Sequence, residues 1–520
     1  MTLNNAVTSP QSPTGGPDRA PGHTGTLAAA CGAVFVAQVA TSLPASLTAL
    51  LQADLNTRGT QLTWITAAFM IAVVCFEFTF GALGDLFGRR RLMAAGMALV
   101  AAGSAVAALA PTVQVLWIGA ALSGLGAGAT FPSSLTAITA VTRSARERAH
   151  AVALWSGLLS AGAAVSPLLG AIFTTTGSWR GPFWVLVALA LVGIALALTL
   201  ATESKAPTGR TRDAAGQITF TLGLILVLYC AIEWPGSGWA LPALLALGAC
   251  LLVAFAVIEL RAESPILDLR LFRNRAFTVS SIVTVVGMFA FLGACFAIGL
   301  WLGPVQHQEP IRVAILFLLL QGPPLLLIPV ISALLHYIAP PWLMTSGFTL
   351  MAIGCLLCTR LDVTDPGLGA FATPALLIGF GFALTLGSVT SVALNSVPAH
   401  LSGTASATTN TLRNLSFALA PVVLGTVALN NAGSTFATNL TASNLPADQV
   451  AAAVQIAEIG GPIAVNSMPP GITGPAVGGL ALDALGSGLS TVFLICGVVA
   501  AAAAVLTAFG MIKIKADHSA

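Results

Sequence analysis

The sequence predicts an all-α polytopic membrane protein. Of its 520 residues, 56% are hydrophobic and only 8% carry a charge, and the mean hydropathy is +0.92. Soluble domains carry about 25% charged residues, so this chain has too few polar groups to cover a water-facing surface. Disorder of the whole chain is excluded because disordered chains are poor in apolar residues. The net charge of +3 is too small to indicate a nucleic-acid partner.

Long apolar runs divide the chain into candidate membrane-spanning helices. A hydrocarbon core about 30 Å thick needs ~20 apolar residues per helix, and continuous runs favour helices over the alternating strands of a barrel. The seventh run is short and the thirteenth contains a charge, so twelve or thirteen spans remain alternatives to fourteen. The fourteen runs lie at residues 27–51, 62–84, 92–110, 114–140, 150–175, 183–201, 216–233, 240–260, 277–302, 312–335, 342–360, 369–393, 403–430 and 487–511.

The basic residues orient these runs. With the N-terminus inside, sixteen of the 21 Lys and Arg residues fall in cytoplasmic segments, four fall outside and one, Arg413, falls within a span. Because cytoplasmic loops retain basic residues, the sequence predicts both termini in the cytoplasm. Residues 1–25 and 513–520 are predicted as cytoplasmic tails, the first of them disordered. Residues 431–486 contain no Lys or Arg and are predicted as an external loop with a short helix near 449–459.

Two patterns resemble motifs of the major facilitator superfamily. The loop after the second span, residues 81–91, is similar to the superfamily's Gly-x-Leu-Ala-Asp-x-x-Gly-Arg-Arg, although Leu86 stands where a basic residue is common. Its matching residues are Gly81, Asp85, Gly88, Arg89 and Arg90. The fifth span resembles the Gly-rich helix of the superfamily's exporters at Gly162, Pro167 and Gly170. Generic packing by small residues remains an alternative for that helix.

Together with residues 261–275 and 411–415, the fourteen runs resemble the fourteen-helix drug:proton antiporter family. The resemblance implies two six-helix bundles, at 26–202 and 261–512, with two extra helices at 203–260 and a central site exposed to alternate sides. It also implies a bacterial cytoplasmic-membrane exporter that exchanges drugs or antibiotics for protons. Two departures affect the coupling. Ala40 and Ala120 stand where the family often carries an acid and an Arg, so proton coupling by the usual route is in doubt.

Ionisable groups within the hydrocarbon are costly and are therefore functional candidates. Glu77 is the only acid predicted clearly inside a span, and Arg413 lies at a similar depth in the thirteenth span. In the superfamily fold the two helices are neighbours across the seam between the bundles. We hypothesise that Glu77 and Arg413 pair in one transport state and separate in another, so that Glu77 binds and releases a proton. A static ion pair is the alternative.

Three further polar or aromatic residues lie in mid-span and are candidates for substrate binding: Gln38, Trp155 and Gln321. An amide hydrogen-bonds a ligand, and an indole ring stacks on a flat or cationic one. Contacts between helices are the alternative role for each of them.

The sequence lacks the motifs expected of an ATP-driven transporter or a metal-dependent enzyme. It contains no Gly-x4-Gly-Lys-Ser/Thr loop for ATP and no spaced His or Cys cluster for a metal, so we expect no cofactor and a proton gradient as the driving force. An apolar pathway favours small lipophilic substrates over sugars or phosphates. We expect a monomer in contact with membrane lipids. The alternatives are an importer or uniporter on the same fold and, remotely, a membrane-embedded lipid enzyme.

Overall fold

The computed structural model describes residues 22–55, 61–174, 177–205, 213–233, 240–262, 265, 267, 269–365, 367–397, 402–443, 445–468 and 474–512, in which all regular elements are helices. The first half contains α1 (His23–Ser46), α2 (Thr48–Leu55), α3 (Gln61–Phe87), α4 (Arg89–Ala108), α5 (Val113–Val141), α6 (Ala145–Thr174) and α7 (Arg180–Leu200). Next come α8 (Ala214–Glu233) and α9 (Ala240–Arg261). The second half contains α10 (Arg275–Leu300), α11 (Pro310–Gln321), α12 (Pro323–Leu326), α13 (Ile328–Tyr337), α14 (Pro340–Cys358), α15 (Gly369–Asn395), α16 (Ser402–Ala442), α17 (Ala447–Asn466) and α19 (Pro475–Ile512).

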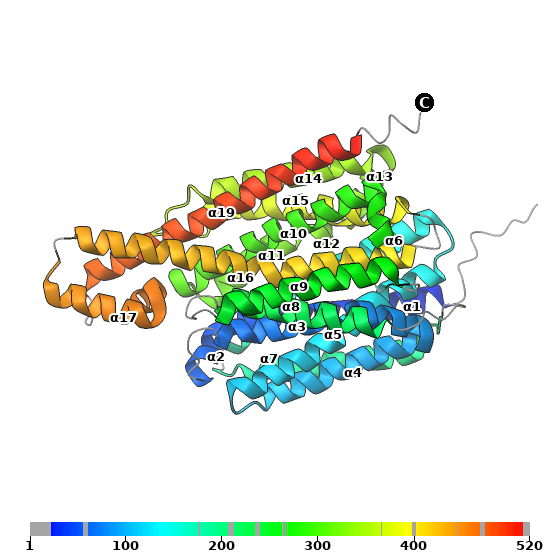
Figure 1. Ribbon diagram of the computed structural model, residues 1–520, viewed down its shortest axis with the longest axis horizontal. Coiled ribbons are helices and arrows are strands. Elements are labelled where there is room, and N and C mark those ends of the chain that lie inside the picture. Colours follow the sequence, from blue (N-terminus) through cyan, green and yellow to red (C-terminus); the bar gives the residue numbers. More distant parts are fainter. Residues whose placement is uncertain are drawn as a thin grey trace, which may run out of the picture.

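The long helices run side by side and form two bundles, each with its own apolar core (Figure 1). One core collects buried side chains from α1 to α8, and the other collects them from α10, α11, α14, α15, α16 and α19. The two bundles meet where α3 packs against α16 and where α6 packs against α11. The bundle bounds 26–202 and 261–512 stay predictions; the first core also includes Leu224 and Leu228 of α8, from the segment predicted as two linker helices.

Twelve helices of the described residues are long and apolar enough to span a membrane, or thirteen when the two segments of α3 count as one bent span. The remaining predicted run, 312–335, is divided over α11, α12 and α13, because Pro323 directly follows Gly322 and interrupts the helix. Fourteen spans therefore stay a prediction. Of the predicted tails, 1–21 and 513–520 lie outside the described residues, whereas α1 already begins at His23.

The segment predicted as an external loop, 431–486, is largely helical instead. With 41 and 38 residues, α16 and α19 are each about 60 Å long at 1.5 Å per residue, twice the hydrocarbon thickness. Their extensions and α17 enclose a small apolar core that includes Phe436, Leu440 and Val477. Figure 1 shows this helical extension projecting from the bundles at the end opposite to the C-terminus.

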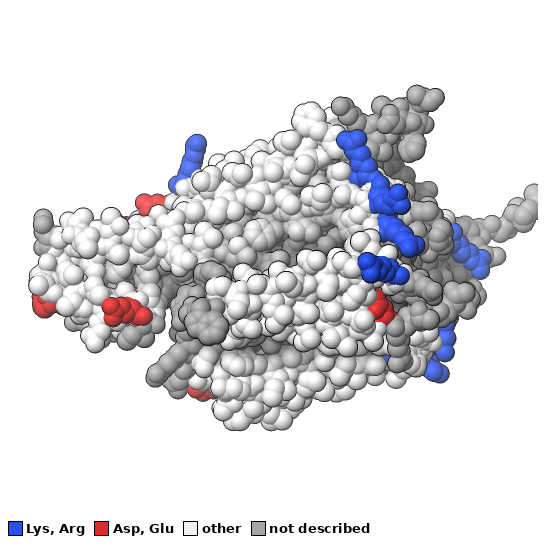
Figure 2. Space-filling model, viewed as in Figure 1, with Lys and Arg blue, Asp and Glu red and all other residues white. Residues whose placement is uncertain are grey.

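Charges are segregated along the bundle axis. In the view of Figure 2, most Lys and Arg side chains gather near the end where α19 finishes, whereas most of the visible acidic side chains lie toward the other end, on or near the helical extension. This distribution is the one expected when the end carrying the C-terminus faces the cytoplasm.

The predicted orientation is testable with single cysteines in a Cys250→Ser background, since Cys250 is the exposed one among the native cysteines that the structure describes. In intact cells, a membrane-impermeant maleimide is expected to label Asp448→Cys, at the exposed start of α17. Arg273→Cys, which is also exposed, is expected to react only after the membrane is opened. Labelling of Arg273→Cys in intact cells would contradict the orientation.

Candidate functional site

Glu77 lies completely buried in the seam between the two bundles. It ends the first segment of α3, whose two segments, Trp64–Glu77 and Thr79–Phe87, meet at an angle of 49°. Its carboxylate accepts a 2.7 Å hydrogen bond from the Asn414 side-chain amide of α16. A buried carboxylate is costly unless hydrogen-bonding partners replace water, so Asn414 supplies part of that replacement from across the seam.

Arg413 precedes Asn414 on α16 and is 6% exposed. Among the ion pairs of the described residues none joins Arg413 to Glu77, although the two charges interact through space. The guanidinium carbon lies 5.8 Å from the ring centroid of Trp155 in α6, within the ~6 Å range of cation–π contacts. The Trp155 indole N–H in turn donates to the Ser134 hydroxyl of α5 over 3.0 Å.

The structure thus brings together three residues that the sequence singled out: Glu77, Arg413 and Trp155. They lie on three different helices and meet where the bundles touch. Asn414 completes the group and was missed by the sequence analysis. A neutral amide within a span costs less free energy than a charge, so it is weaker evidence of a functional site. The signal for Asn414 was its position directly after a charged residue in the middle of an apolar helix.

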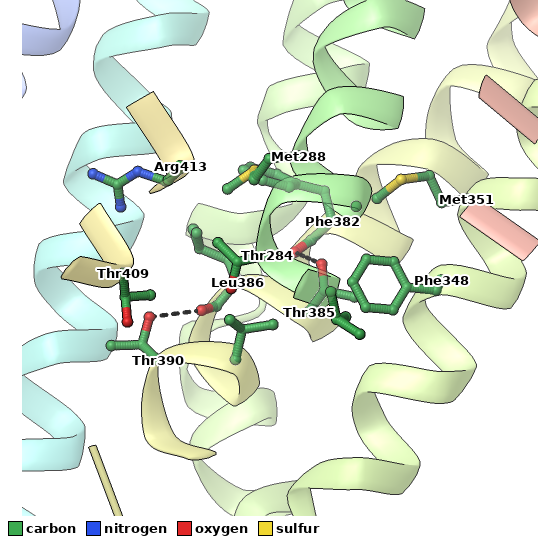
Figure 3. Close-up of a pocket in the computed structure, with 13 residues that line it drawn as sticks. Thr284, Met288, Phe348, Met351, Phe382, Thr385, Leu386, Thr390, Thr409 and Arg413 are labelled. Atoms are coloured by element: carbon green, nitrogen blue, oxygen red, sulfur yellow. Dashed lines mark hydrogen bonds between the residues drawn. The ribbon is translucent and has the colours of Figure 1, made fainter. Parts of the chain in front are cut away.

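Arg413 also lines a cavity inside the second bundle, enclosed by α10, α14, α15 and α16 (Figure 3). Its wall combines apolar side chains, including Met288 and Phe382, with the hydroxyl groups of Thr284 and Thr409. In Figure 3 the guanidinium lies at the edge of this group and extends toward the first bundle. The cavity volume of about 20 Å³ admits a water molecule but no drug-sized molecule.

Ala40 and Ala120 line one common cavity of about 10 Å³ in the first bundle, together with residues such as Phe69 and Leu186. The described residues around it include no ionisable side chain. The two positions at which the family often carries an acid and an Arg are therefore neighbours here, and both are apolar. Within the described membrane core this leaves the seam around Glu77 as the place where acid and base approach each other.

Gln38 and Gln321 are buried, but among the described residues no hydrogen bond or ion pair joins either of them to Glu77 or Arg413. Gln38 donates to the Ser42 hydroxyl of its own helix over 3.2 Å, and its side chain packs against Gly162 of α6. Gln321 ends α11. Their role in substrate binding remains a prediction.

The exporter-type helix α6 lies unusually close to α1. A Cβ atom at Gly162 would come within 2.6 Å of the Phe35 carbonyl oxygen, and one at Gly170 within 2.8 Å of the Ser46 hydroxyl. Pro167 lies between these two contacts. The motif therefore serves as a close packing surface between α6 and α1, and it places Trp155 of the same helix toward the seam.

The motif at residues 81–91, predicted as a loop, instead forms the end of α3 and the start of α4 with only Gly88 between them, and its side chains form a compact cluster. Asp85 pairs with Arg89 at 3.0 Å, and Arg89 donates to the Thr136 carbonyl at the end of α5 over 3.2 Å. The Glu203 carboxylate accepts a bond from the Arg90 backbone N–H and lies 3.7 Å from Arg91. Glu203 was missed as a site residue. It is an isolated acid in a strongly basic cytoplasmic region, which is the signal that sequence inspection offers.

The Glu203 carboxylate packs directly against Gly88. The φ of Gly88, +107°, is disfavoured for residues with a side chain, and a Cβ atom there would lie 2.3 Å from a Glu203 oxygen. Gly81, in contrast, has open space where a Cβ atom would be placed.

We expect Gly88→Ala to destabilise the protein by about 1–3 kcal/mol through backbone strain and displacement of Glu203. Gly81→Ala, inside α3, is the matched control and is expected to raise stability by up to about 1 kcal/mol, because alanine favours the helix and its Cβ atom meets open space. Unfolding of the purified protein in detergent measures both. Equal effects of the two substitutions would refute the role assigned to Gly88.

Comparison with known proteins relates this geometry to other chains. The sequence model of the Major Facilitator Superfamily matches residues 29–421. The tetracenomycin C resistance and export protein of Streptomyces glaucescens is 26% identical over 489 residues, which cover 93% of this chain and 90% of that protein. The multidrug efflux pump LfrA of Mycolicibacterium smegmatis is 29% identical over 474 residues, covering 88% and 91%.

A solved structure has the same fold. The crystal structure of the human organic anion transporter MFSD10 (TETRAN) superposes with a TM-score of 0.58 at 16% identity, covering 92% of this chain and 100% of that one. At this identity the similarity concerns the fold alone. The multi-pass membrane architecture, the two bundles, the loop motif and the family match over residues 29–421 lead to one conclusion: the chain belongs to the major facilitator superfamily.

Proposed function

We propose that the protein exports lipophilic drugs or antibiotics across the bacterial cytoplasmic membrane by proton antiport, with alternating access between its two bundles. The similar proteins named for antibiotic resistance and export support the direction and the class of substrate. The apolar lining of the cavity beside Arg413 supports a lipophilic cargo. No cofactor takes part, the proton gradient supplies the energy, and the protein works as a monomer among membrane lipids.

The observation that carries the coupling proposal is the burial of Glu77 between the bundles, bonded to Asn414 and close to Arg413 without an ion pair. A seam that opens and closes changes what surrounds this carboxylate. Where Arg413 approaches, the carboxylate is retained in its charged form. Where Arg413 stays with Trp155, as in this conformation, binding of a proton relieves the buried charge. Alternation between these surroundings moves one proton per cycle.

The route through Glu77 also accounts for Ala40 and Ala120. An apolar cavity at those positions offers no group that binds a proton, so an antiporter of this sequence needs its acid elsewhere. Glu77 is fully buried, lies at the bundle interface and has a partner on the opposite bundle. These are the properties that a proton site in an alternating-access transporter requires.

The gradient sets the size of the expected effect. One charge moved across the membrane yields about 2.3 kcal/mol per 100 mV, which corresponds to about 50-fold accumulation of substrate. We expect inverted vesicles with the wild-type protein to accumulate a lipophilic antibiotic and to lose it when an uncoupler is added. We expect Glu77→Gln to abolish accumulation while permitting passive equilibration of the antibiotic.

Glu309→Gln is the matched control, because Glu309 is an exposed acid at the start of α11 whose carboxylate lies 3.9 Å from Arg312. Its variant is expected to accumulate substrate like the wild-type protein. If Glu77→Gln retained uncoupler-sensitive accumulation, Glu77 would not be the proton site. If the wild-type protein only equilibrated substrate, regardless of the uncoupler, the protein would be a uniporter and the proposed antiport would be wrong.

A further inference from the structure

The first extra helix, α8, is attached to α3 near both of its ends. On the side away from the loop motif, the Trp64 indole N–H donates to the Glu233 carboxylate over 2.8 Å, and the Trp64 ring lies 5.8 Å from the Tyr229 ring. The buried side chains Leu224 and Leu228 of α8 belong to the core of the first bundle. The extra helix is thus part of the first bundle rather than a separate linker.

Near its other end, α8 contacts α3 through the side chain of Gln217. The Gln217 amide nitrogen donates to the Cys75 carbonyl oxygen over 2.6 Å and to the Thr221 hydroxyl over 2.9 Å. The Gln217 amide oxygen accepts a hydrogen bond from the Thr79 hydroxyl. One side chain therefore holds α3 at two points, two residues before and two residues after Glu77.

These two points flank the bend in α3. In a regular helix the Cys75 carbonyl is the acceptor for the backbone N–H of Thr79. Sharp bends occur where a side chain engages a carbonyl of this backbone ladder, and in a membrane every backbone polar group near a bend needs a partner. Gln217 provides that partner at the 49° angle between Trp64–Glu77 and Thr79–Phe87.

We propose that Gln217 is a positioning residue that holds α3 in its bent form and thereby aligns Glu77 with Asn414, which gives the extra helix α8 a role in coupling. The hydrogen bonds of Gln217 go to Cys75, Thr79 and Thr221 rather than to Glu77, so Gln217 acts through α3. The effect on coupling rests on the proposed function, because it assumes that Glu77 binds the transported proton. The effect on the bend does not depend on transport.

Two variants test the inference. Gln217→Leu removes both halves of the amide at similar volume, and Thr79→Val removes only the hydroxyl that donates to Gln217. Thr219→Val is the matched control on the same helix, because the Thr219 hydroxyl bonds only to carbonyls of α8, those of Ala215 and Gly216. Spin labels at residues 61 and 87, the two ends of α3, report the bend in the purified protein.

We expect Gln217→Leu to lengthen the distance between the labels, since a straighter α3 separates its ends. We also expect transport at a fixed pH to fall by about fivefold for each of the two hydrogen bonds to α3 that are lost, and its pH profile to shift. Thr79→Val is expected to act in the same direction, whereas Thr219→Val changes neither quantity. The shift in pH profile should vanish in a Glu77→Gln background, which separates positioning of Glu77 from general instability.

An unchanged distance in Gln217→Leu would overturn the inference irrespective of transport. A longer distance with an unaltered pH profile would overturn the link to Glu77. Failure of the proposed function is recognised separately, because the parent protein with Gln217 intact would then show no proton-coupled accumulation.

Discussion

Burial of Glu77 between two bundles constrains the whole structure, because a carboxylate inside hydrocarbon persists only where protein groups replace water. The replacement comes from both sides of the seam. Asn414 donates from the second bundle, and α3 is held at the level of Glu77 by an amide from α8. A movement that separates α3 from α16 therefore changes the solvation of the acid. This dependence of one charge on the fit of two bundles is the physical basis of the coupling that we propose.

The other parts of the fold support that seam. Glycines of α6 allow close contact with α1, which fixes the helix that carries Trp155 beneath Arg413. The cytoplasmic cluster around Gly88 connects the end of α3 to α5 and to the segment after α7. Each of the two helix pairs at the seam, α3 with α16 and α6 with α11, includes one helix held by these contacts, α3 or α6. We therefore infer that motion occurs mainly between the bundles rather than within them.

The sequence predicted the parts of this arrangement that carry a large energetic signal. A charge in an apolar span is rare enough to identify Glu77 and Arg413, and long apolar runs located nearly every spanning helix. Uncharged amides gave a weaker signal: Gln38 and Gln321 were selected for their mid-span position, whereas Asn414 and Gln217 were recognised only from their contacts across helices. The helical extension was predicted as a loop because its small core, including Phe436 and Leu440, is spread over weakly apolar segments. Pairing of such segments depends on tertiary packing that local composition does not encode.

The central claim is that Glu77 exchanges its proton as the substrate binds and the seam rearranges. Proton release by the purified protein in a weakly buffered detergent solution, followed with a pH indicator as an exported antibiotic is added, measures this most directly. If Glu77 is the proton site, the wild-type protein should release about one proton per bound antibiotic and Glu77→Gln should release none. Equal release by both proteins, with equal binding of antibiotic, would contradict it.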